Sequence, residues 1–169
     1  MSYHQSFTSL NHNYVASFDK GHLPLPPSKH VAVVTCMDAR VEPASQLGIN
    51  LGEAHVIRNA GGRAKEALRS IVISQRLLGT REVAVFHHTD CGMLTFNNED
   101  IRKQIKSEES GKAEVASLVD HIDFLPFPDL EQSVKDDVEF LKENPLLLEG
   151  TVITGWTYDV KTGKVKQIA

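Results

Sequence analysis

The chain has 169 residues, of which 41% are hydrophobic and 24% charged, and its formal net charge is −4. This composition is typical of a globular protein, and we expect a single domain over residues 1–169. The charge favours neither a nucleic-acid nor a membrane partner, and apolar runs such as residues 71–73 are far too short to cross a bilayer. The first residues lack a basic region followed by an apolar stretch, so we expect no secretory signal and a cytoplasmic location.

An amphipathic helix is predicted near the N-terminus. Large apolar side chains recur there at helical spacing: Tyr3, Phe7, Leu10, Tyr14 and Phe18. Gly21 and the prolines of residues 24–27 end the pattern. Because this stripe lies on an arm, residues 1–25, that precedes the first strand, we predict that the arm packs on a partner subunit. Packing on its own domain is the alternative.

The first strand is predicted over residues 30–35. Its core, residues 31–34, is continuously apolar and mostly β-branched, which is typical of a strand buried on both faces of a parallel sheet. A loop with a short helix that starts at Pro43 follows, and a second strand is predicted over residues 54–58. Residues 59–62 form a tight turn where the backbone can approach a ligand.

A long helix is predicted over residues 63–78, with Gly79 as its C-cap. A third strand follows over residues 82–87. Strand, crossover helix and strand form a right-handed unit whose two strands run parallel.

The C-terminal half is predicted to begin with a helix over residues 97–107 and a polar surface loop over residues 108–118. A further helix, residues 129–142, has Asp129 as its N-cap. Two strands joined by a hairpin turn end the chain. The fold class is therefore α/β: a mainly parallel β-sheet flanked by helices, with an N-terminal helical arm and a C-terminal hairpin.

Cysteine and histidine side chains, which can bind zinc, lie at the ends of two of the predicted strands. Cys36 ends the first strand, and adjacent histidines and Cys91 follow the third. Ligands gather at the carboxyl ends of parallel strands. Two thiolates and one imidazole leave the fourth position of zinc open, which is the arrangement of catalytic sites. We predict one Zn²⁺ per chain. His87 and His88 compete for the metal, because successive strand side chains point to opposite faces.

These residues resemble the signature of the β-carbonic anhydrase family. The motif reads Cys36-x-Asp38-x-Arg40, then Arg58-Asn59-Ala60-Gly61, then His88-x-x-Cys91. The resemblance covers residues 26–92 and continues more loosely to the C-terminus. Its spacing selects His88 as the ligand beside Cys36 and Cys91. Residues 87–93 are similar to the compact bacterial and fungal branch, which also contains carbonyl sulfide hydrolases.

The resemblance implies that Asp38 and Arg40 are catalytic. Arg40 can hold the Asp38 carboxylate with a bidentate pair of hydrogen bonds, so that Asp38 orients zinc-bound hydroxide. Freed from Arg40, Asp38 can instead occupy the fourth zinc position and close the site. The sequence does not choose between these arrangements. The resemblance further implies that Gly61 and Gly92 bind substrate.

The leading function is the reversible hydration of carbon dioxide to bicarbonate by zinc-bound hydroxide. One alternative is the hydrolysis of carbonyl sulfide to hydrogen sulfide and carbon dioxide. Another is a non-enzymatic zinc- or bicarbonate-binding module with Asp38 permanently on the metal. Plant-type members carry a substrate-binding glutamine near the position of Pro27, so the substrate contacts differ here. The resemblance also implies a homodimer with interlocked N-terminal helices, or a homotetramer built on it.

Overall fold

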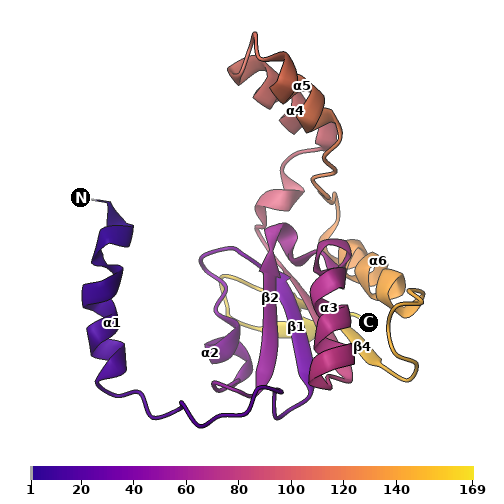
Figure 1. The fold of residues 1–169 in the computed structure, drawn as a ribbon. Helices are drawn as coiled ribbons and strands as arrows, with labels where there is room; N and C mark the ends of the chain where they lie inside the picture. Colours follow the sequence, from indigo (N-terminus) through magenta and orange to yellow (C-terminus); the bar gives the residue numbers. More distant parts are fainter. Residues whose placement is uncertain (1) are drawn as a thin grey trace.

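The structure, a computed structural model, describes residues 2–169 and contains one five-stranded sheet of order β2-β1-β3-β4-β5 (Figure 1). The first four strands are parallel neighbours and β5 is antiparallel to β4. Their bounds are β1 (Val31–Cys36), β2 (Ala54–Asn59), β3 (Glu82–His88), β4 (Val152–Tyr158) and β5 (Val165–Gln167). The predicted α/β class, with its mainly parallel sheet and C-terminal hairpin, is confirmed.

Strand β1 lies at the centre of the parallel part of the sheet, between β2 and β3. All of its residues after Val31 are buried, as its continuous apolar sequence requires of a strand covered on both faces. Since β1 and β3 are parallel neighbours, the residues that end them lie at the same edge of the sheet. The two cysteine-bearing segments are therefore brought together by the sheet itself.

Two helices cover one face of the sheet. Helices α3 (Ala64–Leu78) and α6 (Leu130–Lys142) pack on the strands through one core of buried apolar side chains. Gly79 ends α3 in the left-handed conformation, with φ 77°, as a C-cap glycine does. The short helix α2 (Pro43–Leu47) begins at Pro43, as predicted. It lies over the other face of the sheet, beside Phe86.

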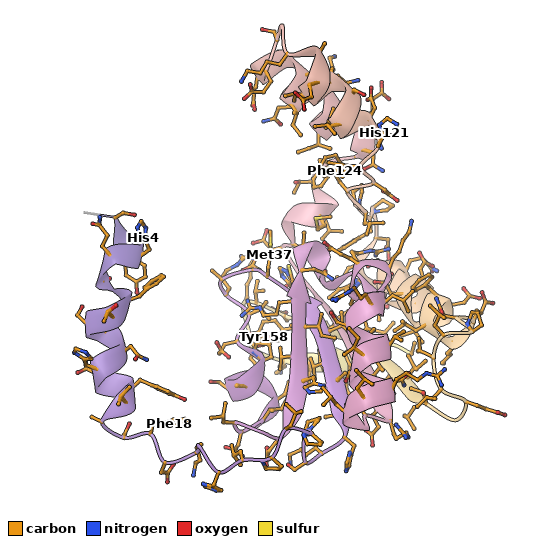
Figure 2. The ribbon with its side chains drawn as sticks, in the orientation of Figure 1. His4, Phe18, Met37, His121, Phe124 and Tyr158 are labelled. Carbon is orange, nitrogen blue, oxygen red and sulfur yellow. The ribbon has the colours of Figure 1, made fainter. Side chains whose placement is uncertain are left out.

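The N-terminal arm is helical, as predicted. A 3₁₀ turn, η1 (Tyr3–Ser6), leads into α1 (Phe7–Val15), which stands apart from the sheet and its helices (Figure 1). Figure 2 shows the side chains between His4 and Phe18 clear of the rest of the chain. The five large apolar side chains of the stripe are all exposed. The alternative that this stripe packs on its own domain is therefore not what the structure shows.

The surface loop predicted for residues 108–118 is wrong. Helix α4 (Asn98–Glu108) is followed closely by α5 (Ala113–Asp120), and the two form a hairpin that projects from the sheet (Figure 1). His121 and Phe124 lie where this hairpin joins the body (Figure 2). Val119 is buried and Val115, four residues earlier, is half-buried. Packing of two helices stabilises a segment too short to be helical alone. Among residues 2–169, none of the helices has the length and apolar character that a bilayer crossing requires.

Gly155 marks the closest approach of β4 to α6. A Cβ atom at this position would lie 2.5 Å from Val134 Cγ1 and 2.8 Å from Val138 Cγ2. We predict that Gly155→Ala lowers the free energy of unfolding by about 1–3 kcal/mol, because an overpacked core must shift to accommodate the methyl group. Thermal unfolding measures this effect. Gly21→Ala, whose new methyl group would lie 3.8 Å from Phe18, is the control. Equal stability of all three proteins would contradict this packing.

Candidate metal centre

Three buried ligand atoms meet at the carboxyl edge of the sheet. They come from Cys36, His88 and Cys91 and all lie within 4.8 Å of one another. Cys36 is the last residue of β1 and His88 the last of β3. Between His88 and Cys91, Asp90 adopts the left-handed conformation with φ 56°. This conformation, which Asp adopts more readily than most residues, turns the chain so that Cys91 returns to the strand ends.

The two sulfur atoms lie 4.0 Å apart, and both cysteines are free. The hydrogen bond between them lowers the pKa of Cys36 and raises the pKa of Cys91, because the thiol of Cys91 can donate to the Cys36 sulfur and stabilise its thiolate. The backbone N–H of Asp38, 3.4 Å from Cys36 Sγ, also lowers the pKa of Cys36. Cys36 and Cys91 would hold a divalent metal as thiolates, so its binding would release their protons.

The imidazole of His88 has a fixed tautomer. Its Nδ1 lies 2.9 Å from the carbonyl oxygen of Thr89, which can only accept, so Nδ1 carries the hydrogen and Nε2 offers a lone pair. Nε2 is buried and has no hydrogen-bond partner among residues 2–169. Burial alone lowers the pKa of His88, but the facing Cys36 sulfur raises it overall. Two thiols and one unpartnered imidazole nitrogen are a donor set that fits zinc.

Asp38 and Arg40 form the predicted pair beside these ligands. Arg40 donates from Nε to Asp38 Oδ1 at 3.0 Å and from Nη2 to Asp38 Oδ2 at 2.8 Å. These hydrogen bonds hold the pKa of Asp38 well below its usual range. Asp38 Oδ2 also lies 3.8 Å from His88 Nε2. Of the two arrangements left open by the sequence, the structure shows the one in which Arg40 holds the carboxylate.

The sequence did not assign roles to Asp90 and Arg58, which complete the polar side of the site. Arg40 donates to Asp90 Oδ2 at 2.6 Å and to its carbonyl oxygen at 2.9 Å. Arg58 donates to the carbonyl oxygens of Cys36 and Asp38, at 3.1 and 2.8 Å. Arg40 thus joins the loop after β1 to the loop after β3. Both residues lie within the quoted motifs, but only tertiary contacts reveal their roles.

His87 lies on the opposite side of β3 from the metal ligands. Its Nδ1 lies 2.7 Å from Ser133 Oγ and its Nε2 3.2 Å from Asp137 Oδ2, both on α6. The alternation of strand side chains therefore separates the two histidines, as expected. His87 is a packed, hydrogen-bonded histidine and is not part of the ligand group.

The two glycines predicted to bind substrate flank the ligands. Gly61 lies in the 3₁₀ turn η2 (Ala60–Gly62) with φ 79°, and Gly92 begins the 3₁₀ turn η3 (Gly92–Leu94) directly after Cys91. A Cβ atom at Gly61 would lie 2.8 Å from Met93 Cγ, whereas one at Gly92 would meet no atom within 4 Å. Substrate binding by these glycines stays a prediction.

Comparison with known proteins identifies the family. The family model described as carbonic anhydrase matches residues 31–165. Beta-carbonic anhydrase 1 of Mycobacterium tuberculosis is 43% identical over 169 residues, and the alignment covers 99% of each chain. The chain belongs to the β-carbonic anhydrase family. β-Carbonic anhydrases are zinc enzymes, and the group formed by Cys36, His88 and Cys91 could bind the metal.

Two further relatives of this β-carbonic anhydrase bear on its fold and substrate. A carbonic anhydrase from Glaciozyma antarctica superposes with a TM-score of 0.94 at 54% identity, over 100% of both chains. A carbon disulfide hydrolase from Acidianus sp. is 35% identical over 161 residues, which are 85% of this chain and 79% of that protein. The family thus includes relatives named for two different substrates.

We predict that His88→Ala weakens zinc binding, because it removes one of the three candidate ligands. The loss should exceed the roughly 10–100-fold loss typical of outer-shell substitutions. Competition with a chromophoric chelator measures the affinity. His55→Ala is the matched control, since His55 bonds Ser74 at 2.7 Å and lies outside the ligand group. Equal zinc affinity of the two variants would refute the assignment of His88.

Proposed function

We propose that this chain catalyses the reversible hydration of carbon dioxide to bicarbonate. The proposed zinc ligands are Cys36, His88 and Cys91, and the proposed catalytic residues are Asp38 and Arg40. One observation carries the proposal: the buried, unpartnered Nε2 of His88 faces two thiols, with the Asp38 carboxylate only 3.8 Å away. The carbonic anhydrases among its relatives support the same reaction.

When bound, zinc lowers the pKa of a coordinated water so that hydroxide is available near neutral pH. The side chains of the protein orient this water for attack. Ionised Asp38 can only accept hydrogen bonds, and the hydrogen bonds from Arg40 lower its pKa further below its usual range, so that the carboxylate is ionised well into the acidic range. We propose that Asp38 Oδ2 accepts a hydrogen bond from the attacking water and directs its lone pair toward the carbon of carbon dioxide.

Arg40 keeps the Asp38 carboxylate in this position. Its side chain donates hydrogen bonds to both carboxylate oxygens of Asp38, and it also donates to the side chain and the carbonyl oxygen of Asp90. For Asp38 to reach the fourth metal position, it must give up both hydrogen bonds to the Arg40 side chain. We therefore propose that the arrangement seen here is the active one and that a released Asp38 closes the site. A module with Asp38 permanently on the metal is not supported by this geometry.

We predict that Asp38→Asn keeps zinc but lowers kcat/KM for carbon dioxide by about 10²–10⁴-fold, the usual contribution of a positioned acid–base group. The amide keeps the shape of the carboxylate and loses its charge. Stopped-flow hydration assays and zinc analysis measure the two properties. Asp136→Asn, on the exposed side of α6, is the matched control. Near wild-type activity of Asp38→Asn would show that Asp38 has no catalytic role.

Carbonyl sulfide hydrolysis is the alternative function. The Acidianus relative, a carbon disulfide hydrolase, supports a sulfur-containing substrate within this family. Carbon dioxide and carbonyl sulfide are both small, linear and apolar, so the same catalytic residues serve either gas. Pro27 near the position of the plant-type glutamine also removes one hydrogen-bonding side chain. A hydrogen-bond donor that faces the sulfur of carbonyl sulfide is poorly satisfied. A site with fewer donors therefore accepts carbonyl sulfide more readily.

We predict that carbon dioxide is the better substrate and that carbonyl sulfide hydrolysis is detectable. One pocket contact changes discrimination by only about 1–3 kcal/mol, so the missing glutamine alone does not reverse the family preference. The measurement is the ratio of kcat/KM for the two gases at one pH and buffer. A ratio strongly in favour of carbonyl sulfide would reverse the ranking and leave the zinc site intact.

We propose that the protein forms a homodimer, or a homotetramer built on it, through the arm of residues 1–25. The support is the row of exposed apolar side chains on this arm: Tyr3, Phe7, Leu10, Tyr14 and Phe18. Contiguous exposed apolar surface of this kind marks an interaction site. We also propose a cytoplasmic location. A reducing compartment keeps the free thiols of Cys36 and Cys91 available to zinc.

Removal of residues 1–21 should destabilise the assembly, because the apolar stripe is the proposed contact with the partner. Light scattering before and after truncation measures the molar mass. The double substitution Tyr14→Ser and Phe18→Ser, which keeps the chain length, should act in the same direction. A full-length protein that is already a monomer of full activity would contradict the proposed assembly.

A further inference from the structure

A small apolar cluster lies behind the two ligand cysteines. Cys36 and Cys91 pack there with Met93 and Phe127, and all four residues are buried. Phe127 belongs to the segment between α5 and α6, far from the ligand motifs in sequence. Phe127 therefore connects the metal centre to the C-terminal half of the chain, and it lies outside the ligand motifs.

The ring of Phe127 packs against His87 and Arg63. It stacks on the ring of His87 with centroids 5.1 Å apart and planes at 12°, and the Arg63 guanidinium carbon lies 5.4 Å from its centroid. Asp137 holds both neighbours, with contacts of 3.2 Å to His87 Nε2 and 3.1 Å to Arg63 Nη2. The Asp137 side chain is only 4% exposed and also accepts from the backbone N–H of Ala64 at 2.8 Å. Such a buried, fully used carboxylate fixes the groups around it.

Phe127 also contacts backbone segments that lie next to the two cysteines in the fold. A Cβ atom at Gly61 would lie only 3.2 Å from Phe127 Cε1, so the ring fills the space next to this glycine. The backbone N–H of Phe127 donates to the carbonyl oxygen of Met93 at 3.2 Å. Gly61 lies two residues after Asn59, which pairs with Cys36 in the sheet, and Met93 lies two residues after Cys91. Phe127 therefore contacts a segment next to each of the two cysteines.

We propose that Phe127 is a positioning residue of the metal centre. Its ring links the group of His87, Asp137 and Arg63 to the turn at Gly61, and it packs with Met93 against the two cysteines. The inference rests on the proposed zinc site but is independent of which gas is the substrate. Loss of the ring frees the sulfurs to move, and a metal held by less well-ordered ligands leaves faster.

The test compares wild type, Phe127→Leu and Phe140→Leu, each loaded with zinc. Phe140 packs against the main core of the sheet, α3 and α6, so its replacement has a comparable loss of ring volume away from the metal. We expect Phe127→Leu to release zinc to a chelator roughly 10–100-fold faster than wild type, in the range of substitutions next to metal ligands. Phe140→Leu should release zinc at the wild-type rate even where it lowers Tm.

Cobalt substitution gives a second readout that does not depend on activity. The thiolate-to-cobalt absorption reports the geometry of the two sulfurs, and it should change in Phe127→Leu but not in Phe140→Leu. If Phe127→Leu does not fold, Phe127→Met keeps most of the volume without the flat ring. Identical release rates and spectra in wild type and the Phe127 variant would overturn the inference. Wild type that takes up neither metal would overturn the zinc site itself.

A double-mutant cycle tests the contact directly. Gly61→Ala introduces a methyl group toward Phe127 and Met93, and it also introduces strain because φ at Gly61 is 79°. That strain is present in both backgrounds and cancels in the cycle. We expect Gly61→Ala to accelerate zinc release less when residue 127 is leucine, because the smaller side chain makes room for the methyl group. Additive effects of the two substitutions would contradict the role of Phe127.

Discussion

The lone pair of His88 Nε2 is the constraint on which the site depends. A buried polar atom without a partner costs about 1–3 kcal/mol, and here it is kept in place by the hydrogen bond between Nδ1 and the Thr89 carbonyl. A metal held by His88, Cys36 and Cys91 would offset this cost. The ends of β1 and β3, and the left-handed turn at Asp90, bring these three atoms together.

Two different networks support this centre from opposite sides. On one side, Arg40 connects Asp38 to Asp90 and its side chain is 47% exposed. On the other, Asp137 connects His87 to Arg63, and these side chains are largely buried. Exposed ion pairs are worth little and rearrange easily, whereas breaking a buried pair is costly. The Asp38 carboxylate, for which we propose two positions, therefore lies on the more exposed side, and the two cysteines lie next to the buried network.

The candidate ligands could be predicted from the sequence because they lie in short local motifs. Cys36 follows a continuously apolar strand, the alternation of side chains allows only one of His87 and His88 to face the metal, and the spacing of the family motif selects His88. The βαβ unit predicted that β2 and β3 run parallel, but not the strand order, in which β1 lies between them. Helix α5 was missed because its apolar pattern is short and it depends on packing against α4. Asp90 and Phe127 were missed for another reason: a positive φ and a contact across the fold leave no periodic signal in sequence. The aromatic arm was recognised as a helix, but nothing in a single chain shows what covers it.

X-ray absorption at the zinc edge of the loaded, full-length protein tests the proposed metal centre most directly. Two thiolates and one imidazole require two sulfur atoms at about 2.3 Å and lighter atoms at about 2.0–2.1 Å from zinc. We expect that pattern, with one zinc per chain. A zinc environment without sulfur, or with only one sulfur, would show that Cys36 and Cys91 do not act together as ligands and would contradict the site described here.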